Sequence, residues 1–203
     1  MGQSHIPSLD VPATAKAALQ RFASHPNPKL YRLRPPATED ALAAREAKLG
    51  HRLPPELREA LLLHDGIRET FVHTKDYLGG TKTLSKLRTD FRSQWADLLE
   101  DNDEPPLRFG RRYLVLGAIH GTGHHFVLLD RLRLLNGVHP VVTIDLDDGE
   151  EVQGFRSLAH YLHYLLLDLH DLGAAKLGKL FPEYYSSKVF KRMMREAQKV
   201  EES

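Results

Sequence analysis

Histidine is the residue type most able to do chemistry in this chain of 203 residues, which has twelve histidines and no cysteine. The lack of cysteine excludes disulfides, thiol nucleophiles, Cys-ligated zinc and iron–sulfur clusters. An imidazole can act as an acid or a base near neutral pH and can bind a metal ion. The first functional question is therefore whether the histidines have spacings that fit such roles.

The densest group of histidines surrounds a glycine-rich turn. His120 and His124 are four residues apart, and His125 follows directly. On a helix this spacing would make a metal-binding pair, but the two glycines between them disfavour a helix. A loop could still place the pair on one ion, with His139 or Asp145 brought in by neighbouring strands. No HExxH or similar motif supports a site, so solvated imidazoles at a hairpin turn are the preferred interpretation.

Three more histidines fall on a predicted helix near the C-terminus. His160, His163 and His170 alternate there with leucines. An imidazole has an apolar body and a polar tip, so these residues are expected to rim the buried stripe of the helix. A metal or acid–base site is the less favoured alternative.

Carboxylates gather at two places that could face a partner. The first group holds five carboxylates within seven residues, namely Asp145, Asp147, Asp148, Glu150 and Glu151. The second group is Asp101, Asp103 and Glu104. Such clusters can bind a hard cation or complement a basic protein surface. The spacing does not fit an EF-hand, and a solvated charged turn is the alternative.

Composition excludes several other functions. The 28 Lys and Arg residues against 27 Asp and Glu leave a net charge of +1, too small to attract nucleic acid or an anionic membrane. The short Gly121–Gly123 stretch lacks the third glycine of a dinucleotide-binding loop, and no serine lies in a GxSxG motif. We therefore expect no cofactor and no catalytic residues.

No targeting signal is expected at the N-terminus. The first twelve residues have neither a basic segment nor an apolar run of signal-peptide length. The most apolar stretch, 158–172, is interrupted by histidines and aspartates and cannot span a bilayer. A cytoplasmic location is the expectation.

Helix signals dominate the first half of the chain. A short helix is predicted over Pro12–Ser24, within a proline-interrupted leader of residues 1–36. Thr38 is a suitable N-cap for a helix that Gly50 ends, and Pro54-Pro55 begins another that ends before Asp65. A longer amphipathic helix of about four turns is predicted from residue 84 to residue 98.

Strand signals follow one another in the second half. Strands are predicted at 71–78, 113–116, 126–129, 141–146 and 151–155, mostly separated by turns. A helix capped by Ser157 then runs to 172, and a last amphipathic helix covers 187–203. Strands joined by turns rather than by helices predict an α+β fold with helices packed on an antiparallel sheet.

The segment from residue 39 to residue 66 resembles the opening signature of the SMI1/KNR4 family, also called the SUKH superfamily. The shared elements are a glutamate inside the first helix, a Leu-Gly, a Leu-Pro and a polar residue before a glycine. They correspond here to Glu46, Leu49, Gly50, Leu53, Pro54, Asp65 and Gly66. The family more often has asparagine where this chain has Asp65. The order of later elements also matches, including a strand that ends at Asp130, so the resemblance covers about 38–172.

The resemblance implies a bent antiparallel sheet flanked by helices, and it implies protein binding rather than catalysis. Many bacterial members of the family look like immunity proteins that bind and block a cognate toxin. We therefore expect a binding domain at 37–173, after the leader, and a helical extension at 174–203. The expected partner is a toxin encoded nearby, and the acidic groups are the candidate contact surface. The alternatives are a metal-binding protein or metal-dependent hydrolase built on His120, His124 and His125, and a homodimer formed through the two extensions.

Overall fold

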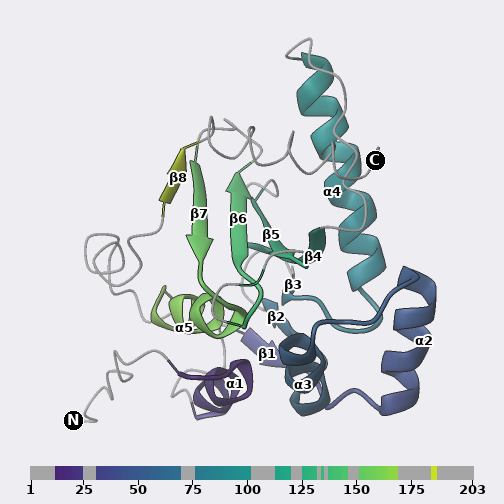
Figure 1. Ribbon diagram of the computed structural model, residues 1–203, viewed down its shortest axis with the longest axis vertical. Helices are drawn as coiled ribbons and strands as arrows, with labels where there is room; N and C mark the ends of the chain where they lie inside the picture. Colours follow the sequence, from purple (N-terminus) through teal and green to yellow (C-terminus); the bar gives the residue numbers. More distant parts are fainter. Residues whose placement is uncertain are drawn as a thin grey trace.

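Two antiparallel sheets and the helices packed on them make up the described part of the molecule (Figure 1). The computed structural model describes residues 12–24, 31–69, 76–101, 113–119, 125–131, 134, 137–145, 151–168 and 184–186. Within these residues the α+β class predicted from the sequence is confirmed. None of the helices in this part of the chain is long and apolar enough to cross a bilayer.

The second and third helices begin and end at the predicted signals, whereas the first starts three residues after Pro12, the expected first position. Helix α1 spans Ala15–Ala23 and is capped by the Thr14 hydroxyl, which accepts the N–H of Ala17. Helix α2 spans Glu39–Leu49 between the Thr38 cap and Gly50, whose φ of 73° is left-handed. Helix α3 spans Pro55–Leu63 and starts at proline, which has no N–H to satisfy.

Two more helices follow among the described residues. Helix α4 spans Leu84–Asp101 and is 18 residues long, so it extends past the predicted end at residue 98. Asp101, expected in an acidic loop, is therefore the last helical residue. Helix α5 spans Leu158–Asp168 and starts where the Ser157 hydroxyl accepts the N–H of His160. The predicted continuation to 172 and the helix at 187–203 lie outside the described residues.

The smaller sheet has three short strands in the order β1-β2-β3. Strand β1 spans Tyr31–Leu33, β2 spans Ile67–Glu69 and β3 spans Asp76–Leu78. Only the last of these was predicted, as part of a longer strand over 71–78 whose first half lies outside the described residues. Three-residue strands between prolines and turns show no alternation long enough to recognise.

The larger sheet is an antiparallel meander in the order β4-β5-β6-β7-β8. Its strands span Tyr113–Ile119, His125–Asp130, Val141–Asp145, Glu151–Phe155 and Tyr184–Ser186. The first four were predicted with nearly the same bounds, whereas β8 was not predicted. Each strand pairs with the next one along the chain, as strands joined by turns do.

The central strands of this sheet are buried on both faces. Alternate residues such as Leu114 and Val127 join a large core with α1, α3 and α5. The residues between them, such as Val115 and Phe126, join a second core with Leu87, Phe91 and Trp95 of α4. Figure 1 shows α4 along one side of this sheet, with α5 and α1 below it. Burial on both faces fixes the register, because a slip of one residue would exchange the two cores.

The two sheets meet at β3 and β4. The N–H of Gly79 donates to the carbonyl of Leu116 at 2.5 Å, beside a register irregularity between Val115 and Gly117. A Cβ at Gly117 would clash with the carbonyl oxygen of Tyr77. Glycine therefore permits the close backbone approach that joins the sheets.

Helix α1 packs on the rest of the described fold. Its predicted apolar stripe (Ala15, Ala18, Leu19, Phe22) is buried in the large core. The Tyr31 hydroxyl also donates to the carbonyl of Phe22 at 2.5 Å. The apolar face of α1 is thus used inside the chain and is not free for a partner.

Candidate functional site

Five strand-end positions form one row across the larger sheet. Ile119 at the end of β4 pairs with His125 at the start of β5, and His125 pairs with Asp145 at the end of β6. Ile144 pairs with Val152, which puts Asp145 and Glu151 at neighbouring strand ends. Glu151 in turn pairs with Ser186 of β8. The connections β4–β5 and β6–β7 therefore leave the same end of the sheet.

Helix α4 brings its last residue to the same end. The helix starts near the junction of the two sheets, and Figure 1 shows its C-terminal turn beyond the ends of β6 and β7. Asp101 is that last residue. We call the strand-end and helix-end positions Asp101, Asp145 and Glu151 the acidic end. These three positions belong to two acidic segments that lie about 40 residues apart in the sequence.

Several predicted site residues lie outside the described part of the chain. They are His120, His124, Asp103, Glu104, Asp147, Asp148 and Glu150. Their roles stay predictions. In the sequence, residues 146–150 lie between Asp145 and Glu151. His120 and His124 lie between the end of β4 and the start of β5.

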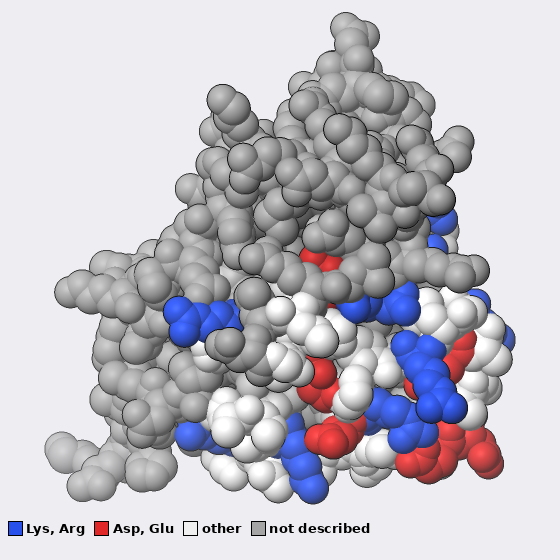
Figure 2. Space-filling model, viewed as in Figure 1, with Lys and Arg blue, Asp and Glu red and all other residues white. Residues whose placement is uncertain are grey.

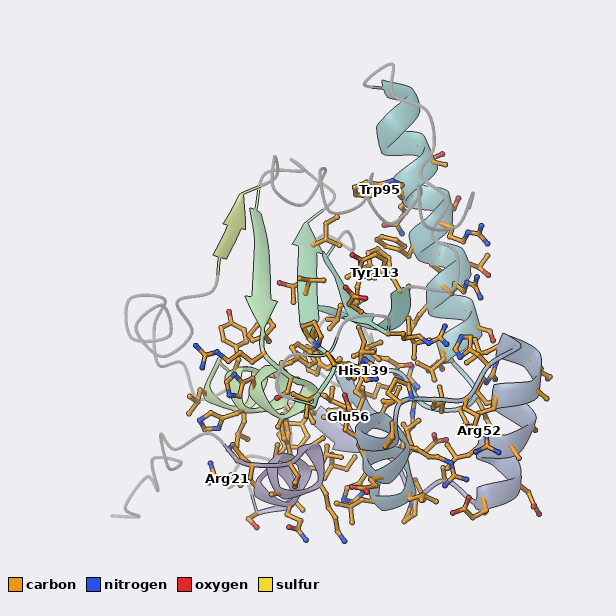
Figure 3. All side chains as sticks on the ribbon, in the orientation of Figure 1. Arg21, Arg52, Glu56, Trp95, Tyr113 and His139 are labelled. Atoms are coloured by element: carbon orange, nitrogen blue, oxygen red, sulfur yellow. The ribbon has the colours of Figure 1, made fainter. Side chains whose placement is uncertain are left out.

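His139 does not lie at the acidic end. It precedes β6, whereas Asp145 ends that strand, and five residues of strand span about 14 Å at about 3.4 Å per residue. Its Nδ1 forms a hydrogen bond with the carbonyl of Asp130 at 3.1 Å, and its backbone N–H donates to Glu56 Oε1 at 3.0 Å. Figure 3 shows Glu56 and His139 close together, far from the top of the sheet.

The remaining described histidines show no metal-binding arrangement. Within the described residues, no group of three His, Asp or Glu side chains is placed to hold a metal ion. His163 is fully buried in α5, whereas rim positions were expected for it, and His160 is half-buried. His170 lies outside the described residues.

Glu46 stabilises the link between α2 and α3. Its Oε1 accepts the backbone N–H of Leu53 at 2.9 Å, and the same oxygen lies 3.7 Å from Arg58 Nε. Arg58 also binds Glu39 through both of its terminal nitrogens. The glutamate of the sequence signature therefore fixes the Leu-Pro turn from which α3 starts.

Asp65 and Gly66 connect the end of α3 to the segment before α4 through hydrogen bonds and close backbone contacts. The Asp65 carboxylate accepts the backbone N–H of Thr81 at 2.6 Å and its hydroxyl at 2.8 Å. Gly66 has a φ of 101°, and a Cβ there would clash with the carbonyl oxygen of Leu78. A Cβ at Gly80 would clash with the carbonyl of Asp65. These two glycines permit backbones to touch where a side chain would separate them.

The remaining signature residues are also structural. Leu53 and Pro54 are buried, Leu49 packs against the large core, and Gly50 ends α2. Asp130 is only 2% exposed, and its N–H donates to the carbonyl of Pro140. The signature residues therefore hold the fold together.

The smaller sheet carries charged residues that the sequence interpretation missed. Arg34 Nη2 binds Asp76 Oδ1 at 2.5 Å, and Arg32 lies directly opposite Arg68 on neighbouring strands. The short strands that position them gave no recognisable pattern. Figure 2 shows basic and acidic side chains interspersed over the described lower part of the surface.

One titratable group is strongly shifted by burial. The Tyr31 hydroxyl lies in the core beneath α1, and burial raises the pKa of Tyr31 to about 12. A buried phenol resists ionisation because the charged form loses its hydration. This group belongs to the packing of α1 and not to a reaction site.

Comparison with known proteins identifies the family. A search of curated proteins finds no match for this chain. The model of the SMI1 / KNR4 family (SUKH-1) matches residues 36–163, more than half of the chain and nearly all of the segment whose motifs carry the resemblance. The chain belongs to the SMI1/KNR4 family (SUKH-1).

Proposed function

We propose that this chain is a non-enzymatic protein-binding module, and that it acts in the cytoplasm as an immunity protein against a bacterial toxin. The family match supports binding of a protein partner. The observation that carries the proposal is that Asp145 and Glu151 lie at neighbouring strand ends, on the side of the larger sheet toward which α4 extends to its last residue, Asp101 (Figure 1).

The acidic end suits a basic partner surface. Asp145 and Glu151 are strand-end positions of the larger sheet, and Asp101 is the end position of α4. Clustered charge raises the association rate with an oppositely charged surface and discriminates against acidic proteins. The near-neutral chain needs such local clustering, since its net charge of +1 supplies no long-range attraction.

The proposal is tested by co-expression with the product of the gene next to that of this chain. The neighbour should arrest growth when it is expressed alone. Co-expression with this chain should restore growth and yield a stable complex. A harmless neighbour, or a toxic one that this chain neither binds nor neutralises, would contradict the immunity role.

The contact surface is tested by charge removal. The first variant replaces the five carboxylates of 145–151 with amides (Asp145→Asn, Asp147→Asn, Asp148→Asn, Glu150→Gln, Glu151→Gln). Loss of close charge pairs should weaken the complex by about tenfold or more. The control variant replaces the exposed Asp40, Glu59 and Asp97 with amides and should bind as the parent does. Equal binding by both variants would show that the carboxylates of 145–151 are not part of the proposed interface.

A further inference from the structure

Two arginines face each other on the exposed surface of the smaller sheet. Arg32 of β1 and Arg68 of β2 are direct partners in the antiparallel register, and both side chains are exposed. The residues beside them in each strand, Tyr31 and Ile67, are buried in the large core. The two arginines therefore share the outer face of the sheet, because successive strand residues point to opposite faces.

The neighbouring carboxylate is used by a third arginine. Asp76 of β3 pairs in register with Arg68, and is only 8% exposed. Its Oδ1 binds Arg34 Nη2 at 2.5 Å, and Arg34 Nη1 reaches the Thr83 hydroxyl at 3.5 Å. Among the residues that the structure describes, no carboxylate forms an ion pair with Arg32 or Arg68.

This arrangement is unfavourable for the isolated fold. Like charges directly opposite on neighbouring strands destabilise the pair, whereas opposite charges stabilise it. Two guanidinium groups side by side can instead hold two carboxylates with paired hydrogen bonds. The surface is thus complementary in charge and in donor geometry to an acidic chain.

We propose that Arg32 and Arg68, here called the arginine pair, form a docking site for an acidic segment of a protein partner. The site is separate from the acidic end, since β1 and β2 belong to the smaller sheet and Figure 1 shows them below the larger sheet, away from the upper ends of β6 and β7. It does not depend on the immunity role, because it needs only a carboxylate-rich peptide.

A protein segment fits this surface better than a nucleic acid. Binding to a phosphate backbone gains its strength from many neutralised phosphates. The arginine pair supplies two cations on a chain with a net charge of +1. Two planar guanidinium groups at a fixed spacing between strands are better suited to bind a few carboxylates than to follow the backbone of a nucleic acid.

The test is binding of a fluorescently labelled ten-residue glutamate peptide, measured by anisotropy on the full chain at low ionic strength. Replacing both arginines (Arg32→Gln with Arg68→Gln) should weaken binding by about tenfold or more. The control changes two exposed cations of α4 (Lys86→Gln with Arg92→Gln) and should stay within about twofold of the parent. Equal binding by the parent and the arginine variant would overturn the proposal.

Two further measurements test whether the paired donors of each guanidinium matter and which class of molecule binds the arginine pair. The lysine variant (Arg32→Lys with Arg68→Lys) keeps the charge but loses the paired donors, so it should bind between the parent and the glutamine variant. If an oligothymidylate binds tighter than the peptide with the same arginine dependence, the occupant is a nucleic acid and the proposal fails. It also fails if replacing the arginines changes the sedimentation of the chain alone, because the pair then binds a second copy.

Discussion

The carboxylate of Asp65 accepts two hydrogen bonds from Thr81, one from the backbone N–H at 2.6 Å and one from the hydroxyl at 2.8 Å. Asp65 ends the helical hairpin of the family signature, and Thr81 precedes the helix that packs on the larger sheet. One side chain therefore joins the two parts of the fold. Asparagine, which is more usual at this position in the family, can make an equivalent pair of bonds.

Removing the Asp65 carboxylate should destabilise the fold. Asp65→Ala leaves the part-buried N–H of Thr81 without its acceptor and should lower the free energy of unfolding by about 1–3 kcal/mol. Asp65→Asn retains an acceptor and, after rotation of the Thr81 hydroxyl, a donor, and should lose much less. Urea unfolding measures both, with the exposed Asp97→Ala as control. Equal losses for alanine and asparagine would show that the hydrogen-bond explanation is wrong.

Gly66 should tolerate alanine worse than Gly137 does. Both glycines have a positive φ, at 101° and 83°, and an alanine in this region costs roughly 1–2 kcal/mol. At Gly66 the new Cβ would also clash with the carbonyl of Leu78, whereas at Gly137 nothing lies within 4 Å. Gly66→Ala should therefore lower the melting temperature clearly more than Gly137→Ala. Similar shifts would contradict the close approach of Gly66 to β3.

Glu46 should act as a hydrogen-bond acceptor rather than as a charge. Glu46→Gln keeps an oxygen for the N–H of Leu53 and should cost less than about 1 kcal/mol, since the partly exposed ion pair with Arg58 adds little. Glu46→Ala removes the acceptor and should cost about 1–3 kcal/mol. Urea unfolding compares them with the exposed Glu59→Ala. A glutamine variant as unstable as the alanine variant would show that the charge matters instead.

Tyr31 should make the fold sensitive to alkaline pH. Its pKa is about 12 in the folded protein and about 10 when exposed, so the folded state holds the proton more tightly. Its contribution to stability is complete below pH 10 and is lost as the pH rises from 10 through 12. Tyr31→Phe should flatten the fall in unfolding free energy over this range. If the unfolding free energy of the variant fell as steeply with pH as that of the parent, burial of the Tyr31 hydroxyl would not be the cause.

Local signals explain how much of the fold could be predicted. Thr38, Gly50 and Pro54-Pro55 fix the ends of α2 and α3 through capping and backbone geometry, which act within a few residues. Strands β4 to β7 were predicted because apolar runs alternate with turns. Strands β1 and β2 have three residues each, and their pairing depends on partners more than 30 residues away.

The candidate site was predictable only in part. The sequence marked Asp145 and Glu151 as members of an acidic cluster, and Asp101 as a member of another. Their convergence follows from antiparallel register and from the direction of α4, which no local pattern specifies. In the less favoured metal-site interpretation, His139 or Asp145 was to join His120 and His124, but the position of His139 before β6 puts it at the other end of that strand from Asp145. The pairing of Arg32 with Arg68 depends on the same kind of long-range register.

The most direct test of the protein-binding role is a growth-rescue experiment with the neighbouring gene product. We predict arrest by the neighbour alone, full rescue by this chain, and loss of rescue in the variant whose 145–151 carboxylates are amides. The control variant at Asp40, Glu59 and Asp97 should rescue as the parent does. Rescue by the amide variant would contradict the acidic end as the contact surface. A neighbour that is harmless, or that this chain cannot neutralise, would contradict the immunity role itself.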